Sequence, residues 1–248
     1  MKKTFYTLMA LLCLTACDRN EDEVTFENTI AFPRPCHVEY ILSKVGQMSP
    51  NLKEWRMIDE IEESVESKYF NISVLTLDSL EGWNDEDLEF STSIGNGFMP
   101  CGVYCEDSIP EVEQHIHNWA KERTKESATR TILFNFPYRL EGITSLTITA
   151  NQRFNGAEIG ADITDNFIIR NFSPGLFFNY EDYTAYVGGE RIITVSEWLA
   201  LKPLASPCMV LRLNEGIQVK NEGVMFTITM KLTDGKVLTA TTSAVNIF

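Results

Sequence analysis

The stretch VMFTITMKLTDGKVLTATTSAVNI, residues 224–247, decides the fold class of this chain of 248 residues. Apolar and polar residues alternate from its first residue to Leu232, and this pattern predicts a strand with one buried face. The dipeptide Asp234-Gly235 follows, which favours the tight turn of a β-hairpin. β-branched residues return directly after it, so the stretch predicts two strands joined by that turn.

Similar short runs, rich in β-branched and aromatic residues, occur throughout residues 131–248. They include TILFNFP (131–137), SLTITA (145–150), NFIIRNF (166–172) and CMVLRLN (208–214). About seven short strands in this half of the chain favour an immunoglobulin-like β-sandwich over a barrel or a parallel sheet. The stretch TVSEWLALK (194–202) interrupts them, and we expect one or two helical turns there with Ser196 as the N-cap.

Residues 30–130 carry mixed patterns that predict a smaller α+β segment with two helices ahead of the sandwich. Apolar residues at spacings of three and four run along residues 52–70, which predicts the first helix. The second helix is expected to start near Ser108, because Pro110 suits a first helical turn and an apolar stripe follows. The run NISVLTL (71–77) predicts a strand. The sequence therefore predicts a mainly β chain with a domain boundary near the end of this segment.

The N-terminus has the parts of an export signal. Lys2-Lys3 gives a positive start, and an apolar run of about ten residues follows. That run is too short to span a bilayer comfortably. The small residue Ala16 precedes Cys17, so we expect residues 1–16 to be a signal peptide that is removed.

Leu14-Thr15-Ala16-Cys17 resembles the processing box of bacterial lipoproteins. The resemblance implies that Cys17 carries acyl chains, and two or more chains hold a protein stably on a membrane. The alternative is an ordinary secretory signal cleaved near Ala16, with Cys17 free or in a disulfide.

Residues 17–29 are acidic and polar, which is typical of a tether extended by charge repulsion. This cluster resembles the surface-export signal of lipoproteins in Bacteroides-type bacteria. Together with the processing box, GADITDNFIIRNF (160–172) and the closing strands, it resembles uncharacterised lipoproteins of these bacteria in which an immunoglobulin-like domain often closes the chain. The resemblance implies an outer-membrane location, on the surface or periplasmic side, and brings no active-site residues.

The charge balance restricts the partners. The chain has 35 acidic and 21 basic residues, a formal net charge of −14. A surface this negative repels phosphate backbones, so we expect no nucleic-acid partner. Anionic lipid headgroups are disfavoured for the same reason, which leaves acyl chains on Cys17 as the expected membrane contact.

Four of the six cysteines remain once the signal peptide and the expected anchor are set aside. An even number of cysteines in an exported protein suggests structural disulfides, whose pairing the sequence leaves open. Cys101 and Cys105 have one residue too many between them for a redox pair, and no second cysteine pair completes a zinc knuckle. The candidate disulfide cysteines are Cys36, Cys101, Cys105 and Cys208.

Residues for catalysis or metal binding are scarce. His115 and His117 would lie roughly 200° apart around a helix, so they cannot bind one ion together. Glu111 and His115 could share an ion only with a third ligand, such as His37 or a cysteine. The sequence has no nucleophile elbow, phosphate-binding loop or dinucleotide fingerprint. We therefore expect no enzyme activity, no metal and no cofactor.

The segment NFSPGLFFNYEDYTAYVGG, residues 171–189, gathers aromatic rings among turn residues and carboxylates. Such rings present apolar faces to sugars and to proteins, while nearby oxygens orient the ligand. The alternative is that the rings close the ends of the sandwich core. The candidate binding surface comprises Phe177, Phe178, Tyr180, Tyr183 and Tyr186.

These observations favour a non-enzymatic, lipid-anchored protein that binds a glycan or a partner protein. The alternative is a structural or accessory subunit of a fimbria-like assembly, which would exchange the closing strand ending at Phe248. A hydrolase is the least favoured hypothesis, because abundant carboxylates are no evidence for a matched catalytic pair.

Overall fold

The computed structural model describes residues 30–48, 55–57, 64–80, 105–124, 133–173, 176–187 and 193–248. The expected signal peptide, Cys17, the acidic tether and Cys101 lie outside these residues. The described chain is mainly β and sandwich-like, with two α-helices and several sheets, which confirms the predicted fold class. Neither helix is long and apolar enough to cross a membrane.

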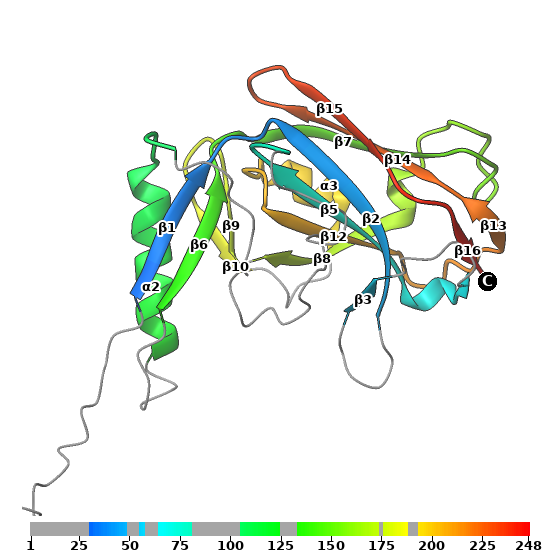
Figure 1. The fold of residues 1–248 in the computed structure, drawn as a ribbon, viewed down its shortest axis with the longest axis horizontal. Helices are drawn as coiled ribbons and strands as arrows, with labels where there is room; N and C mark the ends of the chain where they lie inside the picture. Colours follow the sequence, from blue (N-terminus) through cyan, green and yellow to red (C-terminus); the bar gives the residue numbers. More distant parts are fainter. Residues whose placement is uncertain are drawn as a thin grey trace, which may run out of the picture.

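The largest sheet has six antiparallel strands drawn from both halves of the chain (Figure 1). Strands on either side of residue 130 are hydrogen-bonded neighbours in it, so the boundary expected there does not separate the sheets. In spatial order the strands are β11 (Ile193–Thr194), β8 (Phe167–Ser173), β12 (Cys208–Leu213), β5 (Phe70–Leu77), β2 (Tyr40–Met48) and β3 (Trp55–Met57).

The predicted hairpin forms one side of a three-stranded sheet. β14 (Phe226–Leu232) lies between β15 (Val237–Thr241) and β7 (Ile143–Ala150). Gly235 has a φ of 90°, a left-handed conformation that glycine adopts without steric cost. Every second residue of β14 from Phe226 onward is at most 1 % exposed, as the alternation predicts.

The two sheets face each other across a shared core. Phe70 of the six-stranded sheet and Phe226 of the hairpin sheet have ring centroids 5.4 Å apart. The core takes apolar residues from both sheets, among them Ile41, Ile72, Met209, Leu211, Ile148 and Ile228. This two-layer packing is the sandwich part of the fold.

The closing strand β16 (Val245–Ile247) lies between β13 (Asn221–Val224) and β4 (Ser64–Val65). It runs parallel to β4, and the side chains of Val245 and Ile247 are buried. The amide of Phe248 also donates to the carbonyl of Val65 at 3.0 Å. The C-terminal strand is therefore bound on both sides within its own chain.

A smaller layer stands beside the sandwich (Figure 1). In it β1 (Ile30–Cys36) pairs in parallel with β6 (Leu133–Arg139), and helix α2 (Pro110–Thr124) packs against β1. The helix begins at the predicted proline and buries Val112 and Ile116 completely, so the second predicted helix is confirmed. The core of this smaller layer is a separate cluster that includes Phe136, Tyr138 and Phe178.

The helix predicted over residues 52–70 is wrong where the structure describes that segment. It contains β3, β4 and a 3-10 turn at Ser67–Tyr69, while residues 52–54 and 58–63 lie outside the described residues. Val65 is buried where β4 pairs with β16, and its partner Ile247 is 182 residues away in sequence. A long-range pairing has thus overridden a local helical pattern.

The short helix in residues 194–202 is confirmed as α3 (Val195–Ala200), but its cap is Thr194 rather than Ser196. The amide of Glu197 donates to the Thr194 hydroxyl at 3.1 Å, and the Thr194 amide donates to the Glu197 carboxylate at 2.9 Å. This reciprocal pair is a capping box, so the helix starts two residues earlier than a Ser196 cap would allow.

Candidate functional site

The two phenylalanines of the expected aromatic surface belong to the core. Phe177 and Phe178 are 5 % and 3 % exposed, and they sit on successive positions of β9 (Leu176–Phe178). Phe177 therefore joins the sandwich core and Phe178 the core of the smaller layer. Of the two alternatives for these rings, the structure supports closure of the core, and they cannot contact a ligand.

The three tyrosines of that segment are half-buried and keep part of their surface accessible. Tyr186, on β10 (Ala185–Val187), stacks on Phe177 with ring centroids 5.0 Å apart. Tyr180 and Tyr183 pack against the smaller core. Tyr180 also lies against Gly142, where an added Cβ would come within 3 Å of the tyrosine ring.

The turn between β9 and β10 is held by its own side chains. The Asn179 side-chain oxygen accepts the amides of Glu181 and Asp182 at 2.6 and 3.2 Å. Tyr183 has a φ of 58°, and the Lys202 ammonium lies 2.5 Å from the Glu181 carboxylate. Tyr180 and Tyr183 are consequently presented on a turn held by these contacts, and Tyr186 follows on β10.

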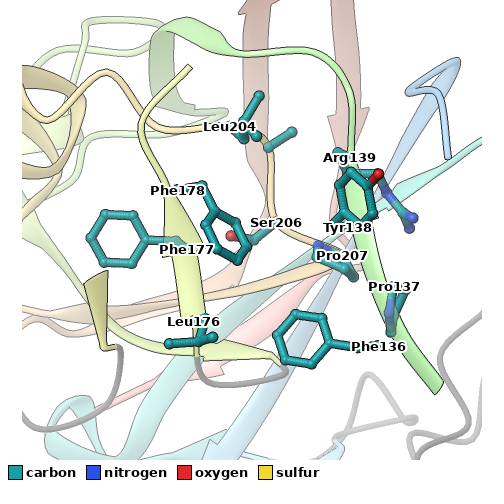
Figure 2. A pocket seen from close by; sticks show the side chains of 11 residues that line it. Phe136, Pro137, Tyr138, Arg139, Leu176, Phe177, Phe178, Leu204, Ser206 and Pro207 are labelled. Atoms are coloured by element: carbon teal, nitrogen blue, oxygen red, sulfur yellow. The ribbon is translucent and has the colours of Figure 1, made fainter. Parts of the chain in front are cut away.

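A cavity behind this segment is too small for a ligand. Figure 2 shows Phe178 and Phe136 turned toward it, with Phe177 on the other side of the strand. Its volume is about 10 Å³, which is near the smallest space that holds one water molecule. A sugar ring would have to bind on the surface of the tyrosines rather than in this cavity.

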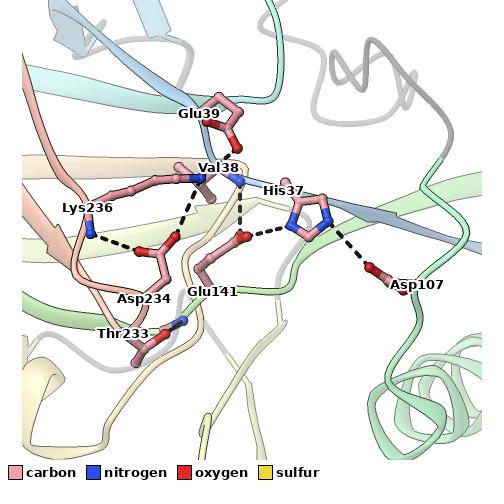
Figure 3. A network of polar contacts seen from close by, with 9 residues as sticks. His37, Val38, Glu39, Asp107, Glu141, Thr233, Asp234 and Lys236 are labelled. Atoms are coloured by element: carbon pink, nitrogen blue, oxygen red, sulfur yellow. Dashed lines mark hydrogen bonds and ion pairs between the residues drawn. The ribbon is translucent and has the colours of Figure 1, made fainter.

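A polar cluster lies where the parallel strands β1 and β6 end (Figure 3). The last pair in the register is Cys36 with Arg139, so His37 and Glu141 follow on neighbouring segments. His37 Nδ1 is 2.6 Å from Glu141 Oε1, although 104 residues separate the two in sequence. The carboxyl ends of parallel strands thus bring together side chains that the sequence keeps far apart.

Glu141 is a fixed partner for His37. Its side chain is 9 % exposed, and its second oxygen accepts the amide of Val38 at 2.9 Å. Its backbone carbonyl accepts the amide of Ala205 at 2.8 Å. The hydrogen bond to Glu141 is the main cause that raises the pKa of His37 above its ordinary value, against the opposing effect of desolvation.

Cys105 and Asp107 meet His37 from the segment that precedes α2. Asp107 Oδ2 lies 3.6 Å from His37 Nε2, and Cys105 Sγ completes a set of three ligand atoms within 4.8 Å of one another. Tyr138 holds this segment in place, because its hydroxyl accepts the amide of Ile109 at 3.0 Å. These three side chains could hold a metal ion.

The sequence indicated two members of this cluster, His37 and Cys105, but did not place them together. His37 was expected to act only as an auxiliary ligand for Glu111 and His115, both of which are exposed on α2. The spacing Cys105-x-Asp107 was the available signal, but Glu141 gave none. Glu141 could not be placed beside His37 without knowing that β1 and β6 are paired.

The hairpin sheet braces the cluster from one side (Figure 3). Lys236, after the β14–β15 turn, lies 2.5 Å from Glu39 and 3.4 Å from Asp234. The Thr233 hydroxyl accepts the amide of Gly142 at 3.0 Å. Two contacts therefore fix the loops that carry His37 and Glu141.

The expected disulfides are not shown. Cys36, Cys105 and Cys208 are not bonded to one another, and the role of Cys101 stays a prediction. Cys208 is buried in the six-stranded sheet, and desolvation raises the pKa of its thiol to about 12.

The fold and the site together define a mainly β, sandwich-like protein with a His/Cys/Asp cluster at the end of its smaller layer. No protein-family model, curated protein or solved structure matches the chain.

Proposed function

We propose that this is an exported, lipid-anchored protein that binds a glycan or a partner protein at the outer membrane. The observation that carries the proposal is the order Lys2-Lys3, an apolar run, Leu14-Thr15-Ala16-Cys17 and an acidic stretch. The first described strand, β1, begins at Ile30, directly after that stretch. This order suits a globular body held off a membrane by an acylated cysteine.

The half-buried tyrosines support binding as the role of the globular body. Tyr180, Tyr183 and Tyr186 combine apolar faces with polar hydroxyls, and Val187 beside them is 62 % exposed. Amphipathic rings on an ordered turn suit recognition of sugars or protein surfaces, because little conformational entropy is lost on binding. The proposed binding surface therefore comprises Tyr180, Tyr183 and Tyr186, without Phe177 and Phe178.

The anchor is tested by Cys17→Ala, with Cys13→Ala as the matched control. The wild-type protein and the control should incorporate a clickable palmitate analogue and sediment with outer membranes. Cys17→Ala should lose both the label and the sedimentation. Retention of the label in Cys17→Ala would refute the anchor.

The tyrosine surface is tested by Tyr183→Asn, since asparagine tolerates the left-handed backbone at this position. The control is Tyr40→Ala, which removes a tyrosine that is 44 % exposed on β2. On a glycan array, Tyr183→Asn should lose binding that Tyr40→Ala retains, with both variants still folded by circular dichroism. Equal binding by both variants would remove the tyrosines as the site.

A further inference from the structure

We propose that His37, Cys105 and Asp107 form a binding site for a divalent transition-metal ion, with Zn²⁺ the best match. Glu141 positions His37 from behind. The site involves neither the lipid anchor nor the tyrosine surface, so it stands or falls independently of the proposed function. Four observations carry the inference: ligand spacing, orientation of the histidine, ligand chemistry and support by surrounding contacts.

The spacing of the ligand atoms fits a tetrahedral ion. Nitrogen and oxygen ligands about 2.0–2.1 Å from zinc lie roughly 3.4 Å apart at the tetrahedral angle. His37 Nε2 and Asp107 Oδ2 are 3.6 Å apart, and all three ligand atoms lie within 4.8 Å of one another. Cys105 is half-exposed, so its thiol is accessible to an ion from solvent.

The histidine is already oriented to present one nitrogen. An ionised carboxylate only accepts hydrogen bonds, so Glu141 places the proton of neutral His37 on Nδ1. The lone pair then resides on Nε2, which points toward Asp107. This arrangement of carboxylate, histidine and metal is the usual way in which proteins fix a histidine ligand.

The identity of the ligands selects the class of ion. Ca²⁺ and Mg²⁺ prefer oxygen ligands alone, whereas imidazole, thiolate and carboxylate together suit Zn²⁺ and its neighbours. On binding, the Cys105 thiol gives its proton to solvent and the thiolate donates its electron pair to the ion. Three protein ligands leave the fourth tetrahedral position to a water molecule or another small ligand.

The surroundings make the site accessible and keep it in place. The side chains of His37 and Asp107 are 45 % and 77 % exposed, so an ion reaches them directly from solvent. Glu141 is buried and hydrogen-bonded at both oxygens, and the Tyr138 hydroxyl holds the segment that carries Cys105 and Asp107. Binding would join the end of β1 to the segment before α2.

The experiment is a titration of the full-length protein, purified in detergent under reducing conditions, with Co²⁺ as the spectroscopic probe. One equivalent should produce the strong visible bands of a tetrahedral ion and a thiolate-to-cobalt charge-transfer band. Zn²⁺ should displace the cobalt and abolish both signals. Circular dichroism checks that every variant is folded.

Each substitution has its own expected result. Cys105→Ser should lose the charge-transfer band, while His37→Gln and Asp107→Asn should weaken Co²⁺ and Zn²⁺ binding by tenfold or more. Glu141→Gln should weaken binding about 10- to 100-fold, yet retain the charge-transfer band at saturation, because it acts through His37. His117→Gln and Glu106→Gln remove an exposed histidine and an exposed carboxylate outside the site, and should bind as the wild type does.

Three outcomes would overturn the proposal. The first is the absence of saturable binding in the wild-type protein, and the second is equal affinity in His37→Gln, Asp107→Asn and the controls. The third is a charge-transfer band that survives Cys105→Ser, which would place the thiolate ligand elsewhere. None of these outcomes would affect the acylation or glycan-binding tests.

Discussion

The sandwich and the smaller layer differ in both size and content. Among the described residues, the sandwich core contains 31 buried apolar side chains, whereas the smaller core contains nine. The six-stranded sheet and the hairpin sheet of the sandwich are antiparallel, while the smaller layer pairs β1 and β6 in parallel and packs α2 against β1. The His/Cys/Asp cluster lies at the end of the smaller layer.

The large core and the candidate metal ligands therefore lie in different parts of the molecule. Parallel strands end at the same edge, so their following residues converge even when they are distant in sequence. A large core holds that edge in place without supplying the cluster itself. We therefore expect substitutions in the sandwich to affect folding most, and substitutions at the cluster to affect ligand binding most.

The largest expected effect is that of Phe226→Ala in the sandwich. Phe226 is fully buried and has ring contacts with Phe70, Phe154 and Phe167. Its loss should lower the free energy of unfolding by about 3–5 kcal/mol in denaturant titrations. Phe136→Ala is the matched substitution in the smaller layer, since Phe136 is also fully buried.

The comparison between the layers rests on how these two variants differ. Phe136→Ala should lower the free energy of unfolding by less than Phe226→Ala does. It should raise amide hydrogen exchange mainly in α2, β1 and β6, because the smaller core opens locally. A uniform rise in exchange, with an equal cost for both variants, would show that the two layers unfold as one unit.

The sequence predicted the parts of the sandwich that depend on local patterns. The alternation in β14 and the Asp234-Gly235 turn act within a few residues, so that hairpin was predictable. The helix α2 was predictable for the same reason. The strand β4 was not, because its partner β16 lies at the far end of the chain and nothing nearby marks the pairing.

The candidate site was less predictable than the fold. An aromatic run does not indicate which rings face inward, and the alternation along β9 put Phe177 and Phe178 into two different cores. The pairing of His37 with Glu141 depends on the parallel register of β1 and β6. Parallel pairing of distant strands leaves no local signal, so the cluster required the structure.

A smaller effect is expected for Gly142→Ala, at the junction between the layers. A Cβ there would lie within 3 Å of the Tyr180 ring and 2.8 Å from Thr233 Cγ2. Relieving that overlap should cost about 1–3 kcal/mol of stability, measured by denaturant unfolding. Tyr180→Ala in the same background should recover part of the loss, because it removes one side of the overlap. No recovery would assign the cost to Thr233 or to the backbone instead.

The smallest effect on folding, and the sharpest contrast between the layers, concerns thiol reactivity. Alkylation requires the thiolate, and a pKa of about 12 leaves Cys208 roughly one part in ten thousand ionised at pH 8. Burial also keeps reagent away from its sulfur. Cys105 is half-exposed in the smaller layer, so iodoacetamide should label it while Cys208 stays unmodified in mass-spectrometric peptide maps. Cys208 should gain label only when denaturant opens the sheet. Labelling of Cys208 in the native protein at the rate of Cys105 would contradict the burial of Cys208 in the six-stranded sheet.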